Sequence, residues 1–102
     1  MSNQNHAFVR ITGATGAIVA RNGAVTSVTR NAAGDFTLLM SSPLAVAERN
    51  VLPVVVDTDA GFAVVEEVDA ATVRVRTSFE IGVLDDPIEL TISVDRIRFL
   101  RS

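Results

Sequence analysis

The 102-residue sequence contains no cysteine, lysine, tryptophan or tyrosine, and its one histidine is His6. The absence of cysteine excludes disulfides and thiolate chemistry. Without cysteine or a second histidine, a transition-metal site would lack its usual sulfur and nitrogen ligands. His6 belongs to a polar N-terminal segment, where we expect it to be solvated. We therefore expect no metal, no cofactor and no catalytic residues, and so no enzyme.

Long apolar runs and an N-terminal apolar signal region are also missing. No run approaches the ~20 residues of a membrane-spanning helix, and the N-terminus, MSNQNH, is polar. The formal net charge of −3 argues against a general affinity for nucleic acid. We therefore expect a soluble protein made in the cytoplasm, unless it is exported by another route, with neither a membrane nor a nucleic-acid partner.

The residues that are present alternate with the period of a β-strand almost everywhere. Forty-eight per cent of them are hydrophobic, mostly valine, alanine and isoleucine, and β-branched residues favour strands. We expect strands near residues 7–12, 17–20, 25–30, 36–40, 51–56, 62–68, 73–76 and 90–94, with one helical turn over 44–48. Strands of this length at ~8–12-residue spacing predict a single all-β domain, an antiparallel β-sandwich of jelly-roll type.

The ends of the chain are expected to lie outside this sandwich. Residues 1–6 are predicted to be a flexible N-terminal arm and residues 7–94 the sandwich domain. After Val94 the apolar residues change from even to odd positions, at Ile97 and Phe99. Residues 95–102 are therefore either a bulged last strand or a C-terminal arm that docks on a neighbouring subunit or partner.

Two local patterns carry specific structural predictions. Asn22-Gly23 is a strong hairpin signal, because both residues tolerate a positive φ. Residues 51–56, VLPVVV, form a continuous apolar run, which predicts a strand that is buried on both faces. Pro53 has no N–H, so it should lie near the start of that strand or at a sheet edge.

The stretch ITGATGAIV, residues 11–19, looks at first like a nucleotide-binding turn. Such a turn needs a following helix, whose N-terminus holds the pyrophosphate. The residues after Gly16 are rich in β-branched side chains and meet Asn22-Gly23, so no useful helix can form. We interpret the glycines as a turn between two strands, and Gly16→Val should impair folding without costing any nucleotide affinity.

Charged residues gather at a few places without a recognisable catalytic arrangement. Carboxylates occur in pairs at 57 and 59, 66 and 67, and 85 and 86. Loop carboxylates can bind calcium, but no EF-hand spacing is present, and solvated charge is the default interpretation. A glycosidase pair is not excluded by composition, although no tryptophan or tyrosine offers a sugar platform. Glu66 and Glu67 should point to opposite faces of their strand.

Four arginines alternate along two predicted strands, at positions 74, 76, 96 and 98. Glu80, Glu89 and Asp95 are plausible partners for surface or inter-subunit ion pairs. The alternative is anion or nucleic-acid binding, which the lack of lysine and of stacking aromatic residues disfavours.

Two segments carry a resemblance to a known family: SVTRNAAGDFTLLMSSPLA, Ser27 to Ala45, and VRVRTSFEIGVLDDPIELTISV, Val73 to Val94. A strand ends in a glycine-containing turn, an aromatic-threonine strand follows, and an Arg-Thr strand later leads to Asp-Pro. From Ala7 to Val94 the chain resembles small β-sandwich modules of tailed-bacteriophage virions, which occur as head-decoration proteins and tail-fibre knobs. The resemblance implies a jelly-roll-like sandwich, often trimeric, that works by assembly.

The function that this resemblance implies is structural. We expect a capsid decoration (cement) protein, located in the virion, that forms a homotrimer and contacts the major capsid protein or other virion proteins. The mean hydropathy of +0.35 suits surface buried between subunits. The alternative is a tail-fibre tip or tail adaptor that binds a host receptor or glycan through the loops near Thr58-Asp59 or Asp85-Asp86. The candidate subunit or capsid contacts are Phe8, Arg74, Arg76, Arg96, Ile97, Arg98, Phe99 and Leu100.

Overall fold

The computed structural model describes residues 7–97 of the chain, and they form an all-β structure. Its strands are β1 (Ala7–Thr12), β2 (Ile18–Arg21), β3 (Val25–Ala32), β4 (Asp35–Met40), β5 (Arg49–Val56), β6 (Phe62–Asp69), β7 (Thr72–Glu80), β8 (Val83–Leu84) and β9 (Glu89–Arg96). The expected helical turn is the 3-10 turn η1 at Val46–Glu48. Within residues 7–97 no helix has the length and apolar character needed to cross a membrane.

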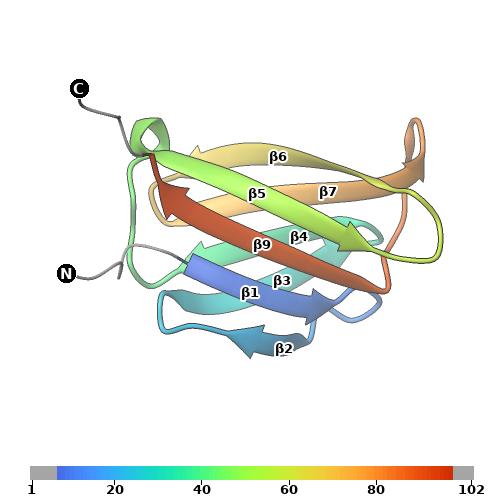
Figure 1. Cartoon of the computed structure of the whole chain (residues 1–102), viewed down its shortest axis with the longest axis horizontal. Helices are drawn as coiled ribbons and strands as arrows, with labels where there is room; N and C mark the ends of the chain where they lie inside the picture. Colours follow the sequence, from blue (N-terminus) through green and yellow to red (C-terminus); the bar gives the residue numbers. More distant parts are fainter. Residues whose placement is uncertain (1–6, 98–102) are drawn as a thin grey trace, which may run out of the picture.

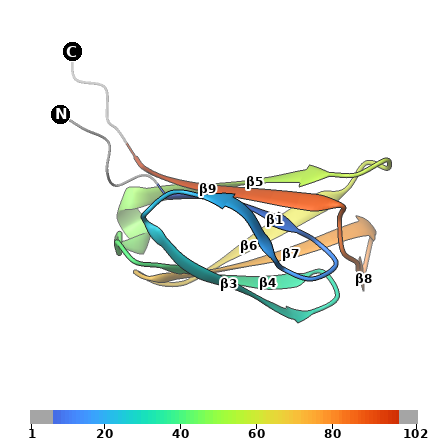
Figure 2. The same cartoon turned by 90° about the horizontal axis from the view of Figure 1, so that it is seen from below.

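The strands form two antiparallel sheets that pack face to face, as Figures 1 and 2 show. Sheet A has the order β2-β1-β9-β5, and sheet B has the order β3-β4-β7-β6, with β8 paired to β7. This arrangement confirms the predicted antiparallel sandwich. Strands β5 and β6 are edge strands of the two sheets, and they lie along the same long side of the molecule (Figure 1). We call this side the β5/β6 edge.

The core lies between the sheets and follows from the period-two pattern. On sheet A the inward positions are Val9 and Ile11 on β1 and Leu90 and Ile92 on β9, all fully buried. They pack against buried side chains of sheet B, which are Phe36, Leu38, Val73 and Val75. Because alternate residues of a strand face opposite sides, the intervening positions form the two outer faces of the sandwich.

The Asn22-Gly23 turn does not form a hairpin. It connects β2 in sheet A with β3 in sheet B, and neither residue has a positive φ. The Asn22 side chain instead accepts hydrogen bonds from the backbone N–H groups of Phe8 (3.3 Å) and Ala24 (3.1 Å). These bonds turn the chain from one sheet to the other, so the hairpin prediction was wrong.

The prediction that residues 51–56 are buried on both faces was also wrong. Strand β5 pairs only with β9, so it lies at an edge of sheet A. Its odd positions, Val51 and Val55, pack against the core, whereas Leu52 is 58% exposed. Pro53 is the fifth residue of this edge strand rather than its first, which confirms the edge position that was expected of it.

The glycines of ITGATGAIV form the turn between β1 and β2, as predicted. Gly16 has φ of +75°, a left-handed conformation that glycine adopts without steric cost. Gly13 is pressed against the turn before β9, where an added Cβ would lie 1.7 Å from the Pro87 carbonyl oxygen. Both glycines are required by backbone geometry.

At the C-terminal end the last strand is regular. Strand β9 pairs with β5 without a register shift, and Asp95 lies opposite Asn50. The predicted bulge near Asp95 is therefore absent, and the strand extends two residues past the expected domain boundary at Val94. Ile97 follows the strand and donates its N–H to the Glu48 carbonyl (2.8 Å). The predicted N-terminal arm, with His6, and residues 98–102 lie outside the described residues.

Candidate functional site

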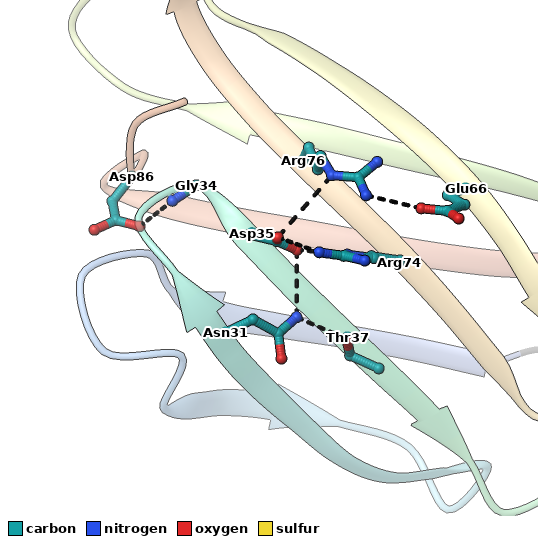
Figure 3. Close-up of polar contacts among 8 residues, drawn as sticks. All are labelled: Asn31, Gly34, Asp35, Thr37, Glu66, Arg74, Arg76 and Asp86. Carbon is teal, nitrogen blue, oxygen red and sulfur yellow. Dashed lines mark hydrogen bonds and ion pairs between the residues drawn. The ribbon is translucent and has the colours of Figure 1, made fainter. Parts of the chain in front are cut away.

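The outer face of sheet B carries a network of charged and polar side chains, shown in Figure 3. Its centre is Asp35 on β4, whose carboxylate accepts two hydrogen bonds from the Arg74 guanidinium, from Nε (2.9 Å) and Nη2 (2.6 Å). Arg76 lies 4.0 Å from the same carboxylate and donates to Glu66 on β6 (2.9 Å). The antiparallel register places Asp35 opposite Arg76 and Arg74 opposite Glu66. The closest hydrogen bonds, Arg74 to Asp35 and Arg76 to Glu66, therefore run diagonally between neighbouring strands. We call this network the charged face.

The charge of Asp35 is held in place by its neighbours. The hydrogen bonds from Arg74 lower the pKa of the Asp35 carboxyl most, against the opposing effect of burial, and a hydrogen bond from Asn31 also lowers it. The same contact raises the pKa of Arg74. Asp35 therefore remains ionised and paired at neutral pH, as a structural group.

For Arg74 and Arg76 the predicted partners were wrong, whereas Arg98 lies outside the described residues. Arg74 and Arg76 pair with Asp35 and Glu66 instead of Glu80, Glu89 or Asp95. Glu89 lies 3.8 Å from Arg10, and Arg96 pairs with Glu48 (2.8 Å). Because their guanidinium groups contact carboxylates of the same chain, Arg74 and Arg76 are poorly placed to bind a foreign anion.

A buried cation at the opposite end of the sandwich had no signal in the sequence. The side chain of Arg49, the first residue of β5, has no exposed surface. Its Nε donates to Glu67 (2.6 Å), and its other nitrogens donate to the backbone carbonyls of Leu44 (3.1 Å), Ala70 (3.2 Å) and Thr72 (3.2 Å). We call this cluster the Arg49 lock. It joins the η1 connection and the β6–β7 turn, while Glu66 points to the outer face as predicted.

At the loop end, Asp86 connects two segments that are distant in the sequence. Its carboxylate accepts hydrogen bonds from the Gly34 N–H (2.8 Å) and from Arg30 Nη2 (2.6 Å). Desolvation works to raise the pKa of Asp86, but the hydrogen bonds from Arg30 and Gly34 outweigh it and the pKa is lowered. The buried Thr77 hydroxyl donates to the Asp85 carbonyl (2.7 Å) and holds the same loop.

Asp57 has an equivalent structural role on the other loop. Its carboxylate caps the turn through the Thr58 N–H (2.6 Å) and accepts a bond from the Ile88 N–H (3.0 Å). Partial desolvation opposes these bonds, yet they lower the pKa of the Asp57 carboxyl. Two of the loop carboxylates considered for ligand binding, Asp57 and Asp86, are thus used to fix the loops.

The remaining loop acids line a shallow pocket of about 280 Å³. It lies between the 57–61 loop and the β7–β8 hairpin, and its lining residues are Asp59, Phe79, Glu80, Val83 and Asp85. Asp59 and Asp85 belong to the two loops that the sequence singled out for receptor or glycan contacts. Across residues 7–97, no group of three or more acidic, histidine or cysteine side chains is arranged to hold a metal ion.

Two apolar patches flank the β5/β6 edge on opposite outer faces. The β5 patch consists of Leu52, Val54 and Val56, which are 58%, 46% and 45% exposed. The β6 patch consists of Phe62 and Val64, which are 51% and 61% exposed. Both patches occupy the outward positions of their strands, since alternate residues of the same strands, such as Val55 and Ala63, pack against the core.

The predicted contact residues divide between these regions. Phe8 lies on the outer face of sheet A, in one row with Ser93 and Leu52, so it adjoins the β5 patch. Arg96 and Ile97 lie at the start of β5, away from the charged face. Arg98, Phe99 and Leu100 lie outside the described residues.

The surfaces differ in how far the chain satisfies them by itself. The charged face, the Arg49 lock and the loop acids Asp57 and Asp86 have partners within the chain, whereas the two apolar patches are exposed to solvent. The sequence signal for the β5 patch was the apolar run 51–56. The chain covers only the inner side of this strand, so the outward residues of the run are exposed. No protein-family model, curated protein or solved structure matches this chain.

Proposed function

We propose that this protein is a structural assembly module of a tailed-phage virion, a capsid decoration subunit that forms a homotrimer and stabilises the head. The observation that carries the proposal is the exposed β5 patch on a strand whose sequence is apolar on both sides. The outer sides of exposed antiparallel sheets are normally polar, and large exposed apolar patches mark interaction sites.

Two further points support an assembly role. The observed sandwich is the fold that the resemblance to virion modules implied. Charged groups that were candidates for ligand binding, such as Asp57 and Asp86, are held in hydrogen bonds and ion pairs that stabilise the fold.

Localisation on the particle tests the proposal. An antibody against the protein should label the heads of particles released by the strain that encodes the sequence, and light scattering should give about three times the 10.8 kDa chain mass. A monomer that is absent from purified particles would overturn the proposal. Labelling of tail tips in place of heads would favour the second candidate.

The second candidate is a tail-fibre tip or adaptor that binds a receptor or glycan. The pocket lined by Asp59, Phe79 and Asp85 favours it, because the pocket lies between the two loops expected to carry such contacts. A glycan array and a host-cell binding assay, each with Phe79→Ala as the matched variant, test this function. Binding that Phe79→Ala abolishes would support it, and a blank array together with no cell binding would reject it.

A further inference from the structure

The apolar residues of the β5/β6 edge exceed what the core of this chain uses. Val51 and Val55 of β5, and Ala63 and Val65 of β6, already pack against the core. The β5 and β6 patches occupy the alternate, outward positions. On the neighbouring strand β9 the outward positions are threonine and serine, at Thr91 and Ser93. The outward apolar residues of β5 are thus not shared by its neighbour β9, although Ile18 and Val19 on β2 and Leu39 on β4 are also exposed.

The backbone edge of β5 is also the least protected of the four sheet edges. Proteins protect exposed edges with short strands, bulges, charges or proline. Strand β2 has four residues and an irregular register, and β3 and β6 have irregular registers as well. Strand β6 also carries Glu66, Glu67 and Asp69. Strand β5 pairs regularly over eight residues, is uncharged from Val51 to Val56, and has Pro53 as its one protective residue.

Charge permits another copy of this chain to cover the edge. The five side chains of the two patches are uncharged. The charged residues beside them are paired within the chain, Arg10 with Glu89 near the β5 patch and Arg76 with Glu66 near the β6 patch. Two copies can therefore bring these surfaces together without opposing like charges.

The position of the patches selects the symmetry of that contact. A twofold contact uses the same surface on both copies, so a dimer through the β5 patch would leave Phe62 and Val64 exposed. A heterologous contact joins different surfaces and can close into a ring, and it buries both patches when the β5 patch of one copy meets the β6 patch of the next. Because the two patches lie on opposite faces of the same edge, each copy can point this edge toward the rotation axis and contact one neighbour with each face.

We propose that the β5/β6 edge lines the threefold axis of the trimer, with the β5 patch of each copy packed on the β6 patch of its neighbour. This inference rests on the homotrimer of the proposed function and specifies how it is built. The molecule measures 42 × 28 × 23 Å, so each outer face has room for the ~800 Å² that one partner contributes to a standard interface.

Single substitutions test whether the patches carry the assembly. Leu52→Asp and Val64→Asp each place a charge in one patch. Light scattering should give about three chain masses for the wild-type protein and one chain mass for each variant. Val19→Asp is the matched control, because Val19 is 47% exposed on β2, which is the edge of sheet A opposite β5. It should leave the trimer intact. Circular dichroism verifies that each variant is folded.

Cross-linking tests which surfaces meet, and the absence of cysteine provides a clean background. The double variant Val54→Cys, Val64→Cys treated with a short bismaleimide should give covalent trimers on a denaturing gel, whereas each single variant should give monomers. Dimers from Val54→Cys alone would show a twofold contact and overturn the proposal.

The outcomes separate this inference from the proposed function. A wild-type monomer, or Asp variants that remain trimeric, would overturn the arrangement whatever the protein binds. Trimers that cross-link as expected but are absent from phage heads would contradict the decoration role and leave the arrangement standing. Asp variants that remain trimeric and still label phage heads would contradict the arrangement of the trimer and leave the decoration role standing.

Discussion

Strand β5 contains two regions that reverse the usual distribution of residues between core and surface. At its start the charged Arg49 side chain is fully enclosed, and three residues later the apolar Leu52 side chain is 58% exposed. Arginine is almost never fully buried unless it is paired, and here a carboxylate and three carbonyls pair it. Leu52 has no comparable environment within the chain.

The difference separates what this chain needs for folding from what it offers to a partner. The Arg49 lock adds hydrogen bonds from a buried cation to three backbone carbonyls, so its effect is on the stability of the single chain. The β5 patch contributes little to the core, so its effect should be on association. Substitutions in the two regions should accordingly change different measurements.

The largest effect is expected from removing the buried cation. Arg49→Met keeps the length of the side chain but removes the ion pair with Glu67, which is 30% exposed, and the hydrogen bonds to three carbonyls, so the expected loss is about 3 kcal/mol. Urea unfolding measures the loss, on chains that also carry Leu52→Asp so that assembly does not contribute.

The matched control is Arg96→Met, because Arg96 lies directly opposite Arg49 in the β5–β9 register. Its side chain is 45% exposed and pairs with the exposed Glu48, so the loss should be within about 1 kcal/mol. Equal losses at Arg49 and Arg96 would show that burial of the cation does not matter.

An intermediate effect is expected at the loop end, where the charge is partly buried. Asp86→Asn weakens the bonds from Arg30 and Gly34, and hydrogen bonds to charged groups contribute about 1.5–3 kcal/mol each at neutral pH. Because the pKa of Asp86 is lowered in the folded state, its contribution is present above the unfolded pKa of about 3.9. That contribution is lost as the pH falls through the folded value.

The pH dependence provides the check on this second prediction. Thermal unfolding is compared at pH 7 and pH 3 for the wild-type chain and for Asp86→Asn. The difference in melting temperature between them should shrink at pH 3, because this pH lies below the unfolded pKa, where the stability that comes from the lowered pKa of folded Asp86 begins to be lost. A difference that stays constant across this range would mean that the charge of Asp86 is not what stabilises the loops.

The sequence was sufficient to predict the strands but not every connection between them. Period-two alternation determines which residues face the core, and the buried Val9, Ile11, Leu90 and Ile92 follow it. Asn22-Gly23 was interpreted as a hairpin because the local signal is the same whether the next strand pairs within the sheet or starts the other one. Its side-chain bond to the Phe8 N–H depends on the assembled sheet.

The functional regions were harder to predict for a related reason. Arg49 is held by carbonyls of residues 44, 70 and 72, and backbone groups leave no pattern in a sequence. The apolar run 51–56 predicted burial on both faces, and this was wrong because β5 lies at the edge of sheet A with its even positions exposed. The position of a strand at a sheet edge depends on the assembled fold, which the run itself does not encode.

The smallest effect is expected where a charge is exposed on the surface next to the β6 patch. Glu66→Gln removes the ion pair with Arg76. The Glu66 and Arg76 side chains are 49% and 32% exposed, and exposed ion pairs contribute about 0–1 kcal/mol. Urea unfolding should detect the loss of stability at low salt but not at ~1 M salt, because exposed pairs are screened.

Asp35→Asn is the control on the same arginines. Since the Asp35 side chain is 9% exposed, the loss of stability in this variant should be larger and less sensitive to salt. The trimer mass should be unchanged in Glu66→Gln, because Glu66 lies beside the β6 patch and not within it. Dissociation of this variant would mean that the interface depends on charge, and the apolar patches would then not account for assembly by themselves.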